Sequence, residues 1–142
     1  MSDSDPGDGL GEAFWAVARR LRTASMAALA EHDVTPSQVR AIRVLSAHDD
    51  GGVRSSELAH HLKIAPRSTT EVVDALEAKG LVTRTRDTED RRAVLVALSE
   101  RGRRLAEEIR RTRGEQSDRV FERLSHADRE HLARILGTLQ DG

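Results

Sequence analysis

The chain has 142 residues, enough for one domain with a hydrophobic core, and its 23 basic and 24 acidic residues give a net charge of −1. It contains no cysteine, which excludes disulfides, thiolate metal sites and cysteine-based redox sensing. No apolar run approaches the ~18 residues that a membrane helix needs, so we expect a soluble protein of the cytoplasm.

Positive charge is concentrated in one short segment. Residues 84–104 contain seven arginines and four acidic residues, a local net charge of +3, whereas residues 1–53 sum to −3. A localised basic surface on a nearly neutral protein is consistent with a phosphate-facing patch, although a solvated face would give the same composition.

The N-terminal third predicts two helices after a tail. Residues 1–9 are acidic and rich in small residues, so a disordered tail is expected rather than a signal peptide. Apolar residues recur at three- and four-residue steps over residues 10–31, which predicts one amphipathic helix. Thr35 is a good N-cap and Gln38 completes a capping box, so a second helix is expected over residues 36–47.

A helix-turn-helix is predicted over residues 55–80. Ser55 is expected to cap the first helix of the pair, and Ala59 is a small residue where two helices can cross closely. Pro66 suits the first position of the second helix, and Gly80 suits its C-terminal end.

A β-hairpin is predicted directly after this helix pair. Residues 81–86 and 93–98 are rich in β-branched residues, and the turn-prone loop between them carries the sequence Asp90-Arg91-Arg92. Two helices followed by an arginine-tipped hairpin predict a winged helix-turn-helix. We therefore expect a mainly α protein with a small β-hairpin wing at residues 81–98.

The remaining chain predicts two charged helices over residues 99–140, each begun by a serine N-cap. The first is too poor in apolar residues to form a core alone, so it needs other helices or a second copy of the chain. We expect residues 10–31 and 99–140 to form a dimerisation region. Residues 36–98 would form the DNA-binding lobe, within a single domain spanning residues 10–140.

Candidate base contacts lie at the start of the second helix of the pair, which enters the major groove in helix-turn-helix proteins. Its exposed face carries Arg67, Ser68, Thr70 and Glu71. Arg67 can pair with guanine through two hydrogen bonds, and Thr70 can contact a thymine methyl group or a phosphate. Glu71 either accepts a hydrogen bond from cytosine or only neutralises Arg67.

The wing adds candidate backbone and minor-groove contacts. Arg91 at the tip is expected in a narrow minor groove, and Arg92 on a phosphate. Asp90 is expected to hold one of these arginines in position, because phosphates repel a carboxylate. Further phosphate candidates are Arg84 and Arg86 on the first strand and Ser55 and Ser56 at a helix N-terminus.

Three stretches carry a family resemblance: Ser56–Ile64, Pro66–Val82, and Asp90–Arg92 followed by Leu98–Gly102. On these motifs, and over roughly residues 10–140, the chain resembles the multiple-antibiotic-resistance regulator (MarR) family of bacterial transcription factors. The resemblance implies a homodimer built from the terminal helices, a pseudo-palindromic operator, and release by a small phenolic or anionic effector. Glu71 departs from the arginine often found there, so the bases read are expected to differ.

Effector binding has its own candidate residues. Trp15, the only tryptophan, lies beside Phe14 on the first helix. Trp15 either packs at a dimer interface or lines an effector pocket with Arg19, one turn along, and Arg43 on the neighbouring helix. An apolar pocket with a cationic rim would suit an aromatic carboxylate or a phenolate.

Other functions have weaker support. The six histidines are scattered in sequence, and no nucleophile motif, paired carboxylates or glycine-rich phosphate loop follows a strand. We therefore expect no catalytic site, no cofactor and no metal site. The alternative function is a winged-helix module that mediates protein association without binding DNA. The near-neutral charge favours this alternative, whereas Arg67, Arg91 and Arg92 weigh against it.

Overall fold

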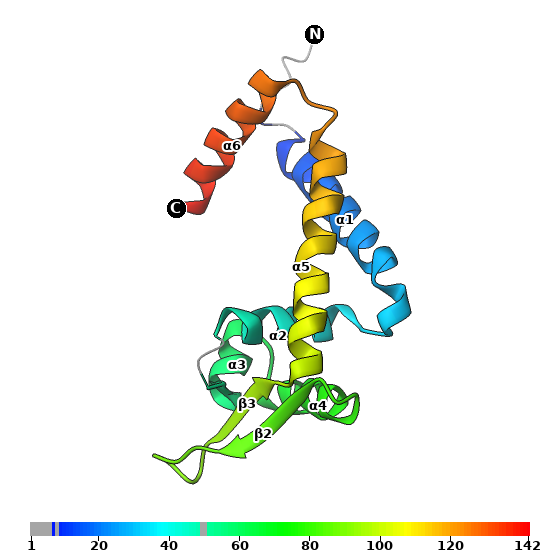
Figure 1. Ribbon diagram of the computed structural model, residues 1–142. Coiled ribbons are helices and arrows are strands. Elements are labelled where there is room, and N and C mark those ends of the chain that lie inside the picture. The colour runs from blue at the N-terminus through cyan, green and yellow to red at the C-terminus, as the bar shows by residue number, and fades with distance from the viewer. Residues whose placement is uncertain (1–6, 8, 49–50) are drawn as a thin grey trace. The chain divides into compact units, whose positions relative to one another are not determined.

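The computed structural model describes residues 7, 9–48 and 51–142 (Figure 1). The predicted disordered tail therefore lies almost entirely outside the described residues. The chain divides into two compact units, one of residues 28–111 and one that joins the N-terminal residues up to 27 with residues 112–142. The predicted fold, mainly α with a small β wing, is confirmed.

The unit of residues 28–111 contains the winged helix-turn-helix. Its elements, in chain order, are η1 (Ala30–His32), α2 (Pro36–Ala47), β1 (Val53–Arg54), α3 (Ser55–Leu62), α4 (Pro66–Ala78), β2 (Val82–Arg86), β3 (Val94–Leu98) and the first half of α5 (Glu100–Phe121). The other unit contains α1 (Leu10–Ala28), the second half of α5, and α6 (His126–Gln140).

The helix caps predicted at Thr35 and Ser125 are present in the structure. The Thr35 hydroxyl accepts a hydrogen bond from the Gln38 amide, and the Gln38 side chain accepts one from the Thr35 amide, both at 3.2 Å. Ser125 accepts a hydrogen bond from the Asp128 amide at 3.1 Å and so begins α6. The first helix is shorter than the predicted 10–31: it ends at Ala28 and is followed by the 3-10 turn η1.

The start of α3 differs from the prediction. Arg54, not Ser55, is the N-cap residue, and Ser55 is already helical. The reason is that Val53 and Arg54 form the short strand β1, which pairs antiparallel with Val96 and Leu95 of β3. The predicted hairpin is thus part of a three-stranded sheet with the order β1-β3-β2, and the chain passes directly from β1 into α3.

The core of the winged unit is aliphatic. Side chains from four helices and three strands contribute to it: α2, α3, α4, α5, β1, β2 and β3. The wing and both helices of the pair therefore pack on the same hydrophobic core. Its most buried large side chains are Leu29, Ile42, Leu58, Val73, Leu76, Val96 and Ile109. Thr69 is also fully buried, and its hydroxyl donates to the Ala65 carbonyl at 3.2 Å.

One junction joins α4, the two wing strands and α5. The Ser99 hydroxyl donates to the Gly80 carbonyl at 2.7 Å, and the Ser99 amide donates to the Leu81 carbonyl at 2.9 Å. Ser99 also accepts from the Gly102 amide at 3.0 Å, which caps α5. A Cβ atom at Gly102 would lie 2.0 Å from the Leu81 carbonyl oxygen, so only glycine fits without displacing backbone.

We expect Gly102→Ala to lower the thermal midpoint, because the added methyl group would push α5 away from Leu81. Overpacking of this kind costs about 1–3 kcal/mol. Gly114→Ala is the matched control in the same helix: nothing lies within 4 Å of a Cβ there, so alanine should stabilise the helix by up to about 1 kcal/mol. Equal effects of the two substitutions on thermal unfolding would contradict the steric argument.

The terminal helices bury no side chain in the single chain. Neither α1 nor α6 contains a buried residue. Large apolar side chains are exposed instead: Leu10, Phe14, Trp15 and Val17 on α1, and Ile135 and Leu139 on α6. No helix in the described part of the chain has the length and apolar character needed to span a membrane.

Candidate nucleic-acid interface

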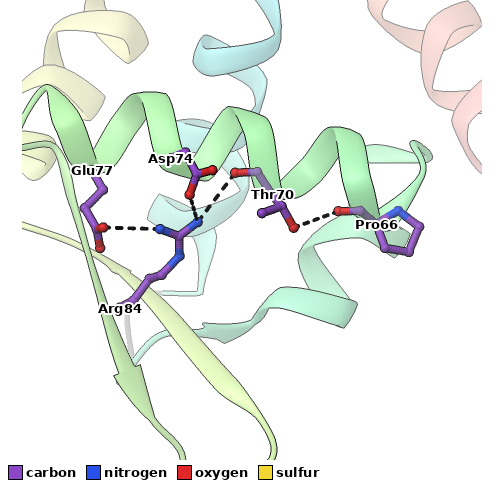
Figure 2. Close-up of polar contacts among 5 residues, drawn as sticks. All are labelled: Pro66, Thr70, Asp74, Glu77 and Arg84. Carbon is purple, nitrogen blue, oxygen red and sulfur yellow. Dashed lines mark hydrogen bonds and ion pairs between the residues drawn. The ribbon is translucent and has the colours of Figure 1, made fainter.

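The first two turns of α4 present a polar, exposed face. Arg67, Ser68, Thr70 and Glu71 are all exposed, whereas the opposite face is buried through Thr69, Val73 and Leu76. The Thr70 hydroxyl donates to the Pro66 carbonyl at 3.0 Å (Figure 2), which leaves its methyl group and its lone pairs for a partner. The predicted base-contact residues therefore share one accessible surface.

The wing tip is a tight turn that displays two arginines. The Ala93 amide donates to the Asp90 carbonyl at 2.9 Å, so Arg91 and Arg92 occupy the central positions of a β-turn. The Asp90 carboxylate accepts a hydrogen bond from the Arg92 backbone amide at 3.0 Å. Asp90 therefore holds Arg92 in the turn through the main-chain amide of Arg92, and its role in positioning an arginine for DNA stays a prediction.

The start of the wing loop is anchored by an ion pair between the largely buried Asp87 and the more exposed Arg54. The Arg54 guanidinium donates to Asp87 Oδ2 through Nη2 at 2.8 Å and through Nε at 3.1 Å. Asp87 Oδ1 accepts from the Glu89 amide at 3.1 Å, and Asp87 is only 9% exposed. The Glu89 amide and Arg54 lower the pKa of Asp87, outweighing the opposing effect of burial.

Arg84 does not point into solvent as a phosphate ligand would. It lies on β2 and approaches α4, where its Nη2 is 2.5 Å from Asp74 Oδ1 and its Nη1 is 3.2 Å from Glu77 Oε1 (Figure 2). The same Nη2 lies 3.5 Å from the Thr70 carbonyl oxygen. The phosphate contact predicted for Arg84 is untested, and this pairing argues against it.

The other predicted phosphate ligands are accessible. Arg86, at the end of β2, is exposed, and so is Ser56 in the first turn of α3. Ser55 is half-buried beside it. These positions remain predicted contacts.

The residues predicted to bind an effector fall in both units. Trp15 and Arg19 line one hollow of about 410 Å³ on α1, together with Glu12 and Ala16. The Trp15 ring packs edge-on against Phe14, with centroids 5.9 Å apart. Arg43 is exposed on α2 and belongs to the other unit.

Two histidines that are distant in sequence come together. The rings of His48 and His61 have centroids 4.8 Å apart, and His48 Nδ1 lies 2.8 Å from the Val44 carbonyl oxygen. Two of the histidines that are scattered along the sequence are therefore neighbours in the fold. No three histidine or acidic side chains of the described residues are grouped so that they could hold a metal ion.

Sequence reasoning missed the residues that orient the wing. The ion pairs of these residues connect β1 with the wing loop and β2 with α4; the residues are Arg54, Asp74, Glu77 and Asp87. One signal was present: residues two apart on a strand share a face, so Arg84 had to lie on the same side as the buried Val82.

Comparisons with known proteins identify the family and the fold. A sequence profile of the MarR family matches residues 34–94. The HTH-type transcriptional repressor Rv2887 of Mycobacterium tuberculosis is 30% identical over 139 residues, which cover 98% of this chain and 96% of the relative.

Solved structures share the whole architecture. The complex of Staphylococcus aureus MepR with DNA has a TM-score of 0.76 at 21% identity and covers 93% of this chain and 96% of MepR. NadR in complex with 4-hydroxyphenylacetate has a TM-score of 0.71 at 27% identity and covers 98% of this chain and 97% of NadR.

The helix pair, the wing and the exposed arginines define a winged helix-turn-helix protein of the DNA-binding class. The chain belongs to the MarR family of transcriptional regulators, which confirms the resemblance seen in the sequence. Its named relatives are transcriptional regulators and repressors, consistent with the expectation of no catalytic site.

The Asp87 ion pair predicts a specific dependence of stability on pH. Because folding lowers the pKa of Asp87, its ionised form stabilises the native state above the unfolded pKa of about 3.9. That contribution is lost as the pH falls through the lower folded pKa. We expect Asp87→Asn to reduce the thermal midpoint at pH 7, with a difference from the parent that shrinks below about pH 4.

The exposed Glu71→Gln, in the same unit as Asp87, serves as the control and should leave the midpoint unchanged across this range. A difference between parent and Asp87→Asn that is the same at pH 7 and at the acid end would contradict a role for the ionised carboxylate.

Proposed function

We propose that this protein is a homodimeric repressor that binds a pseudo-palindromic operator through α4 and the wing. The observation that carries the proposal is the exposure of Arg67 on α4 and of Arg91 and Arg92 on the wing-tip turn. Within the described part of the chain, the guanidinium groups of these arginines make no ion pair, so their charge is available to DNA. MepR has been solved with DNA in the same fold, which supports this role.

The proposed contacts divide into those that read bases and those that position the protein on the DNA backbone. Arg67 and Thr70 would contact base edges in the major groove, with Ser68 and Glu71 beside them. Arg91 would enter the adjacent minor groove. Phosphates would be contacted by the side chains of Arg86 and Arg92 and by Ser55 and Ser56 at the N-terminus of α3.

Substitution should separate these two groups. With a duplex selected by the parent protein from a random library, Arg67→Ala should relax base preference at one position per half-site by about 1–3 kcal/mol. Arg91→Ala should weaken binding chiefly at A·T-rich flanks. The exposed Ser37→Ala on α2, outside the proposed DNA and dimer surfaces, is the control and should bind as the parent does. Parent-like binding by both test variants would refute the assigned surface, and a dimer that binds no duplex would favour the protein-association alternative.

Dimerisation is supported by the unburied terminal helices. Leu10, Phe14 and Val17 lie three or four residues apart on α1, so they share a helix face. Ile135 and Leu139 do the same on α6. An apolar stripe of this extent is typical of a protein–protein interface. We infer that a second copy of the chain covers both stripes, with residues 10–31 and 99–140 as the dimerisation region.

Sedimentation at micromolar concentration should give about twice the mass of the 15.7 kDa chain. Leu139→Glu should shift the protein toward monomer, because it places a charge in the buried stripe. Val94→Glu substitutes another exposed apolar residue, on the wing, and should leave the mass of the dimer unchanged. A parent protein that is monomeric at this concentration would exclude the dimer and the two-fold operator together.

Effector release is the finer part of the proposal. The hollow beside Trp15 and Arg19 combines an aromatic face with a cation, which suits an aromatic carboxylate or a phenolate. NadR, which has the same fold, has been solved with 4-hydroxyphenylacetate. A coupling free energy of about 1–3 kcal/mol between ligand and DNA would suffice for a tenfold or larger loss of operator affinity.

Titrating aromatic acids while following Trp15 fluorescence and operator release tests this regulation. We expect quenching and release to share one midpoint. Release that persists in Trp15→Ala and Arg19→Ala would place the effector elsewhere, and quenching without release would exclude a switch.

A further inference from the structure

The contact between Arg84 and α4 joins the two elements that the proposed function places on DNA. Val82, Arg84 and Arg86 share one face of β2, and the buried Val82 shows that this face turns inward. The Arg84 guanidinium reaches Asp74 and Glu77, which are three residues apart and so share a side of α4 (Figure 2). One planar group therefore contacts two carboxylates on the exposed side of the helix.

The charge of Arg84 is already matched in this arrangement. Its side chain is 26% exposed, and the two carboxylates that surround it carry one more negative charge than it can neutralise. Binding a phosphate would require breaking these contacts and leaving two carboxylates beside a polyanion. Arg86, two residues further along the same face, is exposed and suits that task better.

The geometric effect of the contact is larger than its contribution to stability. Asp74 and Glu77 are well exposed, and ion pairs of this kind add little to the free energy of unfolding. A guanidinium, however, fixes direction because its donors form a rigid fork. Arg91 at the wing tip lies seven residues beyond Arg84, at most about 23 Å away along an extended chain, so tilting the hairpin by about 10° would move Arg91 by up to about 4 Å.

We propose that Arg84 is a positioning residue, which sets the angle between the wing and the recognition helix α4 so that both meet DNA together. The inference rests on the proposed function, in which α4 and the wing bind one operator. It replaces the phosphate contact expected for Arg84 from the sequence.

The test measures the affinity of the full chain for two duplexes of equal length, over a series of salt concentrations. One duplex is selected by the parent protein from a random library, and the other has random sequence. For Arg84→Ala we expect at least a tenfold loss on the selected duplex, little change on the random one, and an unchanged slope of log affinity against log salt. Arg86→Ala, the matched control, should reduce that slope by about 0.9 for each phosphate that the variant no longer neutralises.

The double variant Asp74→Asn/Glu77→Gln gives an independent reading that leaves Arg84 in place. If Arg84 positions the wing, the ratio of selected to random affinity falls, as it does in Arg84→Ala. If Arg84 contacts phosphate, removing its two partners strengthens binding to both duplexes and leaves the ratio unchanged. Thermal midpoints near that of the parent for both variants show that the change arises in the folded protein.

A double-mutant cycle tests the link to the wing tip. Adding Arg91→Ala to Arg84→Ala should cost less than twofold further, because a misdirected wing no longer brings Arg91 to the minor groove. Additive losses, a reduced salt slope, or parent-like affinity of Arg84→Ala would each overturn the inference while leaving DNA binding intact. A parent protein that selects no duplex would instead overturn the proposed function, and this inference with it.

Discussion

The hydrogen bonds around Ser99 hold together the ends of α4, the wing hairpin and α5. Leu81 follows α4 and precedes β2, whereas Ser99 follows β3 and precedes α5, so their backbone contact closes the base of the hairpin. The Ser99 hydroxyl extends the closure to Gly80 at the end of α4, and Gly102 allows α5 to approach Leu81. A recognition helix, a wing and the helix that leads to the terminal unit thus meet within a few residues.

The roles of the acidic residues explain how a nearly neutral chain can still present a basic surface. On the wing and α4, Asp87, Asp90 and the Asp74–Glu77 pair bind backbone amides or arginines and thereby hold local geometry. The arginines they leave available, Arg67 and Arg91 among them, are few and lie on exposed surfaces. A small number of oriented cations can therefore present a basic surface on a protein whose net charge is −1.

Features determined within a few residues could be predicted from the sequence, and those that depend on distant pairing could not. The Thr35 capping box and the Ser125 cap follow from residues three apart, and the hairpin from the alternation on either side of one turn. The pairing of β1 with β3 and the contact between Arg54 and Asp87 join residues more than thirty positions apart. Such contacts depend on how the helices pack, and a local pattern of residue types cannot predict that packing.

The exposed apolar side chains of α1 and α6 have a consequence for the newly made chain before it assembles. If a second copy covers these helices as proposed, exposed apolar side chains such as Phe14 and Leu139 remain in contact with water until that copy binds. In the proposed dimer, the stability of that region would depend on the concentration of the protein itself. Chains made in excess of their partners would be open to proteases and chaperones, so assembly and survival in the cell would be governed by the same encounter.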